Sequence, residues 1–253
     1  MTIGPQLPPG YVLHAFDRLE STNDEARRLA EQGAAAGAVV VAGEQIKGRG
    51  RHGRAWASPP GNLYASLLLR PEGTLAEVAQ LSLVASLALA EALIALAPPA
   101  ADVRVKWPND VLVRGAKVAG LLLESAAEAD DRVAWLIIGS GVNIASAPAG
   151  TPYPATALRD QGFLPVTPLD LLGRYLGALD GWLARWRSGG FGAVRPAWLA
   201  LSSGVGDRVR LRLGREEVAG RFLDVTAAGA LVIAQDDGRR REITAGELMF
   251  VER

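Results

Sequence analysis

The chain has 253 residues, with 27 Lys and Arg, 27 Asp and Glu, two His and no Cys, so its formal net charge is zero at pH 7. A chain with no net charge is not attracted as a whole to nucleic acid or to an anionic membrane. The lack of Cys excludes thiol nucleophiles, Cys-ligated zinc and disulfides. This length, with 49% hydrophobic residues, predicts one or two globular domains, with the cytoplasm as the default compartment.

The first half of the chain alternates strand and helix patterns. The expected strands cover residues 11–19, 38–42 and 63–69. Thr22 and Glu25 have capping-box spacing, which predicts the start of a helix that runs to about Glu31. A longer helix is expected over 74–97. Its most apolar stretch, 81–97, is shorter than the roughly 20 residues of a membrane span, so we expect a buried core helix.

The second half predicts a hairpin, a further strand, two helices and a β-rich tail. The expected strands cover 103–107, 111–113, 117–124 and 133–142, and the expected helices cover 168–187 and 194–201. After a boundary at 202–204, short strands separated by Gly and Asp turns predict a small β-barrel. The sequence therefore predicts an α+β fold with two domains, 1–203 and 204–253.

The most basic segment runs from Lys47 to Arg54 and holds four Lys or Arg and three Gly, with no acid among them. Arginines bind phosphate oxygens bidentately and glycines let the backbone close on a ligand, so this loop is predicted to bind a polyanion and to be mobile when empty. Its glycine spacing matches the dinucleotide fingerprint, but Pro59 and Pro60 prevent the helix which that motif needs. The alternative is a solvated basic loop, and Trp56 beside it is either a platform for a stacked base or a core aromatic.

A second segment, Lys106 to Asp110, ends a predicted strand. Pro108 favours a tight turn, so Asn109 and Asp110 are expected at the end of the strand, where ligand groups are common. Asp110 could hold Mg²⁺ together with substrate phosphates. Alternatively, both side chains satisfy backbone groups of the turn.

Two further strands carry residues suited to a ligand. Lys117 enters an apolar strand, which is costly unless its ammonium meets an anion, and Gly120 leaves room for a flat ligand. An edge-strand lysine that prevents aggregation is the alternative. Gly139 and Gly141 interrupt the next strand before Asn143, whose amide could read an adenine edge; a structural bulge is the alternative for the glycines.

The few His and Lys residues of the chain limit which reactions the site can carry out. Neither His14 nor His52 has a Ser and Asp constellation in the sequence, so a hydrolase triad and a zinc site are not expected. Only three of the 27 basic residues are lysines, Lys47, Lys106 and Lys117, which indicates positions that need a compact ammonium. Together, these segments predict a pocket for a nucleotide and an acid.

Four segments, 48–56, 58–66, 106–110 and 117–124, closely resemble the biotin protein ligase family in their order and spacing. The resemblance implies a mixed-sheet catalytic domain of the class II synthetase-like type with an SH3-like C-terminal barrel. It also implies a ligase that uses ATP and Mg²⁺ to convert biotin to biotinyl-5'-AMP and then transfers biotin to a lysine of a biotin carboxyl carrier protein.

The resemblance also implies roles for individual residues. Lys117, Arg51 and Asp110 are candidate catalytic residues, and Asp110 is a possible Mg²⁺ ligand. The positions expected to bind biotin or ATP are Ser21, Thr22, Asn23, Gln45, Gly48, Arg49, Arg51, Arg54, Trp56, Lys117, Gly120, Gly139, Gly141 and Asn143. His52 replaces the Arg of many family members, which makes the charge of the loop depend on pH.

Partners follow from the same resemblance. The first expected strand begins at residue 11, so we expect neither the DNA-binding domain of bifunctional family members nor a DNA partner. No membrane partner is expected, and a homodimer is possible. The alternatives are a lipoate or octanoate ligase, whose hallmark motif is not found, and a non-enzymatic protein that senses biotin.

Overall fold

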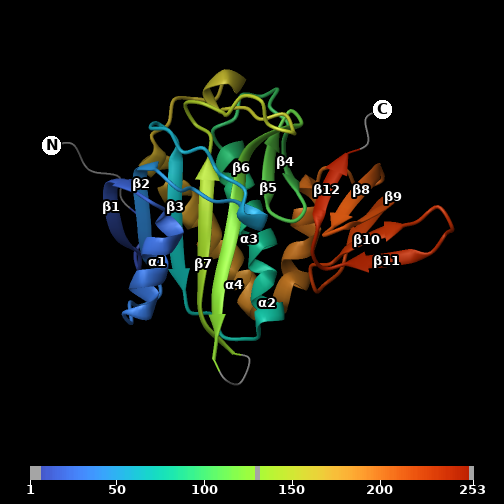
Figure 1. The fold of residues 1–253 in the computed structure, drawn as a ribbon, viewed down its shortest axis with the longest axis horizontal. Coiled ribbons are helices and arrows are strands. Elements are labelled where there is room, and N and C mark those ends of the chain that lie inside the picture. The colour runs from blue at the N-terminus through green and yellow to red at the C-terminus, as the bar shows by residue number, and fades with distance from the viewer. Residues whose placement is uncertain (1–6, 129–131, 251–253) are drawn as a thin grey trace.

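The computed structural model describes residues 7–128 and 132–250, and its larger part is a seven-stranded mixed sheet (Figure 1). The sheet order is β1-β2-β3-β7-β6-β5-β4, with β1 and β2 parallel and the other neighbours antiparallel. The strands are β1 (Val12–Leu19), β2 (Ala38–Gln45), β3 (Leu63–Leu69), β4 (Val103–Lys106), β5 (Asp110–Val113), β6 (Ala116–Ala127) and β7 (Val133–Val142).

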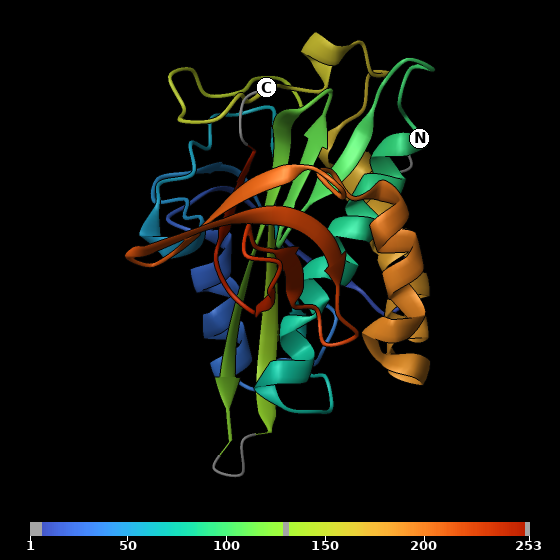
Figure 2. The same ribbon diagram turned by 90° about the vertical axis from the view of Figure 1, so that its right-hand side faces the viewer.

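Helices cover both faces of this sheet (Figures 1 and 2). Helix α1 (Thr22–Glu31) packs on one face against β2, β3 and β7, while α3 (Leu81–Ile94) and α4 (Pro168–Leu201) pack on the other. Since both faces are covered, β3 is buried at every position, which explains its continuous apolar sequence. This arrangement confirms the predicted α+β class.

The predicted apolar helix over 74–97 is two helices. Thr74 and Glu77 form a capping box that starts α2 (Leu75–Ala79), and the chain turns at Gln80 into α3. By length and composition Leu75–Ile94 could cross a membrane, but 67% of its most apolar window is buried in the fold. The prediction of a buried core helix is confirmed.

The predicted capping box at the start of α1 is wrong. Ser21 is the N-cap residue and makes no side-chain cap, and Thr22 is already helical. The Thr22 hydroxyl donates instead to Gln45 Oε1, 3.1 Å away, and Glu25 pairs with Arg28. Because Thr22 bonds to Gln45, the last residue of β2, its side chain contributes to the site described below and does not cap the helix.

The C-terminal part is a strongly curved antiparallel sheet that lies beside the β4 and β5 edge of the larger sheet (Figures 1 and 2). Its order is β11-β10-β9-β8-β12, so the last strand pairs with the first. The strands are β8 (Arg208–Leu213), β9 (Glu216–Val225), β10 (Leu231–Ala234), β11 (Arg240–Ile243) and β12 (Glu247–Phe250). Strand β12 was not among the segments picked out from the sequence. The domain bounds 1–203 and 204–253 stay a prediction.

Several contacts fix the two sheets against each other. The indole nitrogen of Trp107, which is 2% exposed, donates to Gly229 O at 3.2 Å, and Ser203 N donates to Val105 O at 2.8 Å. Arg195 in α4 pairs with Asp224. These contacts hold the C-terminal sheet beside the β4 and β5 edge of the larger sheet, so that β12 lies next to the candidate site.

Candidate functional site

A cavity of about 460 Å³ lies between the start of α1, the basic segment, strands β6 and β7, and β12. It brings together most of the residues singled out in the sequence. The predicted residues that line it are Ser21, Thr22, Asn23, Gln45, Arg49, Arg51, Arg54, Trp56, Asp110, Lys117, Gly120, Gly139 and Gly141. Residues as far apart in the sequence as Ser21 and Phe250 therefore line one site.

Two predicted residues, Gly48 and Asn143, do not line this cavity. Gly48 is buried at the base of the loop, where an added Cβ would lie 2.5 Å from the carbonyl oxygen of Trp56. Asn143 is 2% exposed and its amide nitrogen donates to Thr156 O at 3.2 Å, while its Oδ1 is buried with no hydrogen-bond partner among the described residues. A role of Asn143 at the adenine stays a prediction.

The fold brings acids from other elements to the basic segment, which has none of its own. Lys47 Nζ lies 2.8 Å from Glu20 Oε1 in an exposed ion pair. The Arg49 guanidinium is bidentate on Asp24, with nitrogen–oxygen distances of 2.6 and 2.7 Å. This hydrogen bonding holds the pKa of Asp24 below its usual range.

The other half of the loop contacts the C-terminal sheet. Arg54 forms a bidentate pair with Glu247, with both distances 2.5 Å, and Arg51 Nη1 donates to Gly246 O at 3.0 Å. Burial lowers the pKa of Arg51. Arg51 is the one arginine of this loop that makes no ion pair within residues 7–128 and 132–250. His52 lies exposed at the cavity with a left-handed φ of 56°.

Lys117 meets an anion, as its place in an apolar strand requires. Its Nζ lies 2.6 Å from Asp110 Oδ1 and 5.4 Å from the centre of the Trp56 ring. Strand β6 lies between β5 and β7, so the alternative of an edge-strand lysine is wrong. A cation held against a carboxylate and an aromatic face in a cavity can neutralise charge that develops on a bound substrate.

The glycines of β6 and β7 make room for side chains of the site. An added Cβ on Gly139 would lie 2.2 Å from Asn23 Oδ1, and one on Gly141 would lie 2.6 Å from the Trp56 indole. Register is regular on both sides of these glycines, so the alternative of a bulge is wrong. Trp56 covers Gly120 as well and is half-buried, and its buried indole nitrogen has no hydrogen-bond partner in the part of the chain that the structure describes. A wall formed by an indole and bare backbone suits a flat ligand.

The neighbours Asn109 and Asp110 have different roles. Asn109 also lines the cavity, is 8% exposed, and its amide donates to Leu121 O in β6 at 2.5 Å, so it satisfies a backbone group of a neighbouring strand and not of its own turn. Asp110 lines the cavity and offers one carboxylate, which Lys117 already contacts. No group of three His, Asp or Glu suited to a metal is found among the described residues. One carboxylate fits Mg²⁺ carried by the phosphates of ATP, and the role of Asp110 as a ligand stays a prediction.

Lys106 also lines the cavity and was not among the predicted site residues. It is 8% exposed, and its ammonium lies 4.9 Å from the centre of the Tyr153 ring and 5.4 Å from that of Phe250. Burial lowers the pKa of this lysine. The scarcity of lysine in the chain was a signal for it. Tyr153 lies in a loop and Phe250 in the C-terminal sheet, so their approach depends on tertiary structure.

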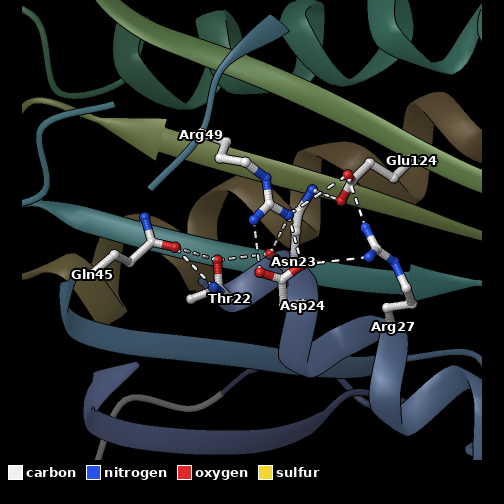
Figure 3. Close-up of polar contacts among 8 residues, drawn as sticks. Thr22, Asn23, Asp24, Arg27, Gln45, Arg49 and Glu124 are labelled. Atoms are coloured by element: carbon white, nitrogen blue, oxygen red, sulfur yellow. Dashed lines mark hydrogen bonds and ion pairs between the residues drawn. The ribbon is translucent and has the colours of Figure 1, made fainter. Parts of the chain in front are cut away.

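A chain of hydrogen bonds supports the wall formed by the start of α1 (Figure 3). Gln45 Oε1 accepts from the backbone N–H and the hydroxyl of Thr22, at 2.8 and 3.1 Å. Ser66 Oγ, fully buried, lies 2.8 Å from Thr22 Oγ1 and 2.6 Å from Asn23 Oδ1. Asn23 Nδ2 then donates to Glu124 Oε2 at 2.8 Å. These polar groups are held in fixed positions before any ligand arrives.

Comparison with known proteins identifies relatives over most of the chain. A sequence model of the biotin/lipoate A/B protein ligase family matches residues 15–143, and one of the biotin protein ligase C terminal domain matches 204–250. A biotin–[acetyl-CoA-carboxylase] ligase of Paracoccus denitrificans is 41% identical over 239 residues, which are 92% of this chain and 98% of the relative.

Solved structures agree with these relatives. A biotin protein ligase from Aquifex aeolicus in complex with biotin and ATP has a TM-score of 0.78 at 30% identity, covering 95% of this chain and 99% of the other. A biotin protein ligase from Leishmania major in complex with biotinyl-5-AMP has a TM-score of 0.63 at 30% identity, covering 94% of this chain and all of the other (100%).

Proposed function

The chain belongs to the biotin/lipoate A/B protein ligase family, and we propose that it is a biotin protein ligase. It activates biotin with ATP to form biotinyl-5'-AMP and transfers the biotinyl group to a lysine of a carrier protein. In the first step, a biotin carboxylate oxygen attacks the α-phosphorus of ATP and pyrophosphate leaves. In the second, a neutral lysine amine attacks the carbonyl carbon, loses a proton, and AMP leaves.

The residues of the cavity fit this chemistry. Lys117 is the group that neutralises charge on the carboxylate and α-phosphoryl oxygens, because its ammonium reaches the cavity from the sheet. Arg49 and Arg51 bind the carboxylate and the phosphate from the loop above. Mg²⁺ accompanies ATP and reduces the charge of its phosphates.

One observation carries the proposal. Cations from the loop and from β6 converge on a cavity with two further surfaces: the polar groups at the start of α1, and the Trp56 indole, which lies on the glycines of β6 and β7. That combination suits an acid with a hydrogen-bonding ring, the ureido ring of biotin, against Thr22 and Gln45, and the flat adenine of ATP against Trp56. The dithiolane ring of lipoate has no N–H or carbonyl group for that polar wall, and the relatives described above are biotin ligases, so a lipoate or octanoate ligase is not favoured.

The acceptor belongs to the same proposal. Biotin carboxyl carrier protein, the biotinylated part of acetyl-CoA carboxylase, is the acceptor that the Paracoccus relative supports. Because the reaction consumes ATP, the cytoplasm is the proposed compartment. A homodimer stays a prediction, which sedimentation velocity tests.

The proposal is tested by transfer to an acceptor. The purified protein, biotin, ATP and Mg²⁺ are incubated with a biotin carboxyl carrier domain, and the acceptor is measured by intact-mass spectrometry. We expect the addition of one biotinyl group, absent without ATP and absent when the acceptor lysine is replaced by Arg. An unmodified acceptor, together with ATP-dependent binding of biotin, would indicate the non-enzymatic biotin-sensing alternative.

A further inference from the structure

Two carboxylates hold Arg49 from outside the cavity (Figure 3). Arg49 lines the cavity, whereas Asp24 from α1 and Glu124 from β6 are not among its lining residues. Nη1 and Nη2 of Arg49 donate to Asp24, at 2.7 and 2.6 Å, and Nη2 lies 3.8 Å from Glu124 Oε1. Arg27 completes the cluster, 3.0 Å from Glu124 and 3.5 Å from Asp24, so two cations and two anions balance.

This pairing leaves Arg49 able to bind a second anion. A guanidinium has five N–H donors in a fixed plane, and the Asp24 carboxylate accepts from two of them. The remaining donors include Nε–H, and the side chain of Arg49 is 34% exposed. Asp24 therefore fixes the plane and the direction of the guanidinium without using all of its donors.

The same cluster is joined to the wall where the biotin ring is proposed to lie. Glu124, which lies beside Arg49 and binds Arg27, also accepts from the Asn23 amide at 2.8 Å. Asn23 belongs to the hydrogen-bond chain of Thr22 and Gln45. The position of Arg49 is thus coupled to that wall. One connected network therefore sets the distance between the groups that hold the ring of a bound ligand and the group that holds its carboxylate.

We propose that Asp24 is a positioning residue that orients Arg49 for the carboxylate of the acid substrate. This inference rests on the proposed function, since it takes biotin as that acid. Asp24 touches no substrate and acts through Arg49. Without the Asp24 charge, the long side chain of Arg49 samples other rotamers. Substrate binding must then also fix the rotamer of Arg49, and this entropy cost weakens the binding of the carboxylate.

The test is the replacement Asp24→Asn, which keeps the size of the side chain but removes the bidentate carboxylate. Biotin-dependent ATP–pyrophosphate exchange is measured over biotin and ATP concentrations. We expect KM for biotin to rise about five- to tenfold, because a charge-assisted bidentate pair is lost. KM for ATP and kcat are expected to stay within about twofold, since Lys117 and Arg51 are unaffected.

Glu25→Gln is the matched control. Glu25 is the next residue on α1 and makes a similar pair with Arg28, at 2.6 Å, but that pair does not line the cavity. The control removes the same charge from the same turn of the helix, and it is expected to leave both KM values unchanged. A double-mutant cycle with Arg49→Gln adds a second readout: the effect of Asp24→Asn on KM for biotin is expected to disappear when Arg49 is absent.

Three results would overturn the inference. These are an unchanged KM for biotin in Asp24→Asn, an equal rise of both KM values with a lower thermal midpoint, and an effect that persists undiminished in the Arg49→Gln background. Wild-type exchange separates this inference from the proposed function. If the wild type shows no biotin-dependent exchange, the proposed function fails, whereas failure of Asp24→Asn alone leaves that function intact.

Discussion

At the scale of single residues, Lys117 and Arg51 are the cations on which the proposed reaction depends most directly. Lys117 is held by Asp110 and lies over Trp56, so its ammonium has a fixed place in the cavity. Arg51 has no ion pair among the described residues and donates to a backbone carbonyl of the C-terminal sheet, Gly246 O. The larger sheet therefore positions Lys117 and the basic loop positions Arg51, and we expect the ligand to lie between these two cations.

Replacing Lys117 by Ala is expected to abolish adenylation and retain the fold. The loss of a positioned cation should reduce ATP–pyrophosphate exchange by about a hundredfold or more. It also leaves the Asp110 carboxylate unpaired, which should destabilise the protein by about 1–3 kcal/mol. Exchange assays and urea unfolding check both effects. Lys47→Ala, at a lysine that does not line the cavity, is the control, and full exchange activity of Lys117→Ala would contradict the assignment.

Replacing Arg51 by Gly is expected to release biotinyl-5'-AMP early. The loop then loses its bond to Gly246 and its contact with the phosphate, so the adenylate escapes and acylates lysines of bystander proteins. Labelling of serum albumin, detected with streptavidin, measures this. Arg239→Gly, at a position whose side chain is 84% exposed, is the control. Unchanged selectivity of Arg51→Gly for the carrier domain would count against the role of Arg51.

At the scale of elements, the glycines of β6 and β7 decide what the sheet can bind. A Cβ at Gly139 or Gly141 would collide with Asn23 or Trp56, so these glycines are required by side chains and not by unusual backbone angles. Strands β3 and β7 match their predicted ranges because apolar runs between turn residues are strong local signals. The division between α2 and α3 at Gln80 has no such local signal in the sequence. The predicted capping box at Thr22 does not form because its hydroxyl makes a tertiary hydrogen bond to Gln45 instead.

Gly141→Ala is expected to weaken ATP binding without unfolding the protein. The new Cβ would lie 2.6 Å from the Trp56 indole, so the half-buried ring must move away from the sheet. We expect KM for ATP in the exchange assay to rise about tenfold or more, because the indole surface proposed for adenine is displaced. A changed near-ultraviolet circular dichroism spectrum should report the moved indole. An unchanged KM together with an unchanged spectrum would contradict this account.

Gly177→Ala is the matched substitution in a helix. Gly177 lies in α4, has no positive φ, and an added Cβ meets nothing within 4 Å. Alanine reduces the freedom of the unfolded chain, so stability is expected to increase by about 0.5–1 kcal/mol with unchanged exchange activity. Urea unfolding measures the change. A destabilised Gly177→Ala protein would contradict this expectation, because it would mean that the space beside Gly177 is not open.

At the scale of the whole molecule, the C-terminal sheet forms one wall of the site. Glu247 and Phe250 of β12 line the cavity and meet Arg54 and Lys106 of the larger part of the chain. The basic character of the loop could be predicted from its sequence, but its partner acids could not. Asp24 lies 25 residues before Arg49 and Glu247 lies 193 residues after Arg54, and only the fold brings each pair together.

The pair of Glu247 and Arg54 gives a pH-dependent contribution to stability. Hydrogen bonding to Arg54 lowers the pKa of Glu247 from its ordinary value of 4.5. A lowered folded-state pKa stabilises the protein above pH 4.5, and this contribution is lost as pH falls through the folded-state pKa. Glu247→Gln is therefore expected to be less stable than the wild type at pH 7, by about 1 kcal/mol or less because Arg54 is exposed, and equally stable well below pH 4. A difference that persists unchanged at pH 3 in urea unfolding would contradict this.

The central claim, that the cavity adenylates biotin, is tested most directly by ATP–pyrophosphate exchange. The purified protein is incubated with ATP, Mg²⁺ and labelled pyrophosphate, with biotin, with lipoate, or with neither acid. We predict that label enters ATP with biotin alone, because the polar groups of Thr22 and Gln45 can hydrogen-bond the ureido ring of biotin, which lipoate lacks, with Lys117 and Arg51 nearby. Exchange that depends on lipoate, or no exchange with either acid, would contradict the account.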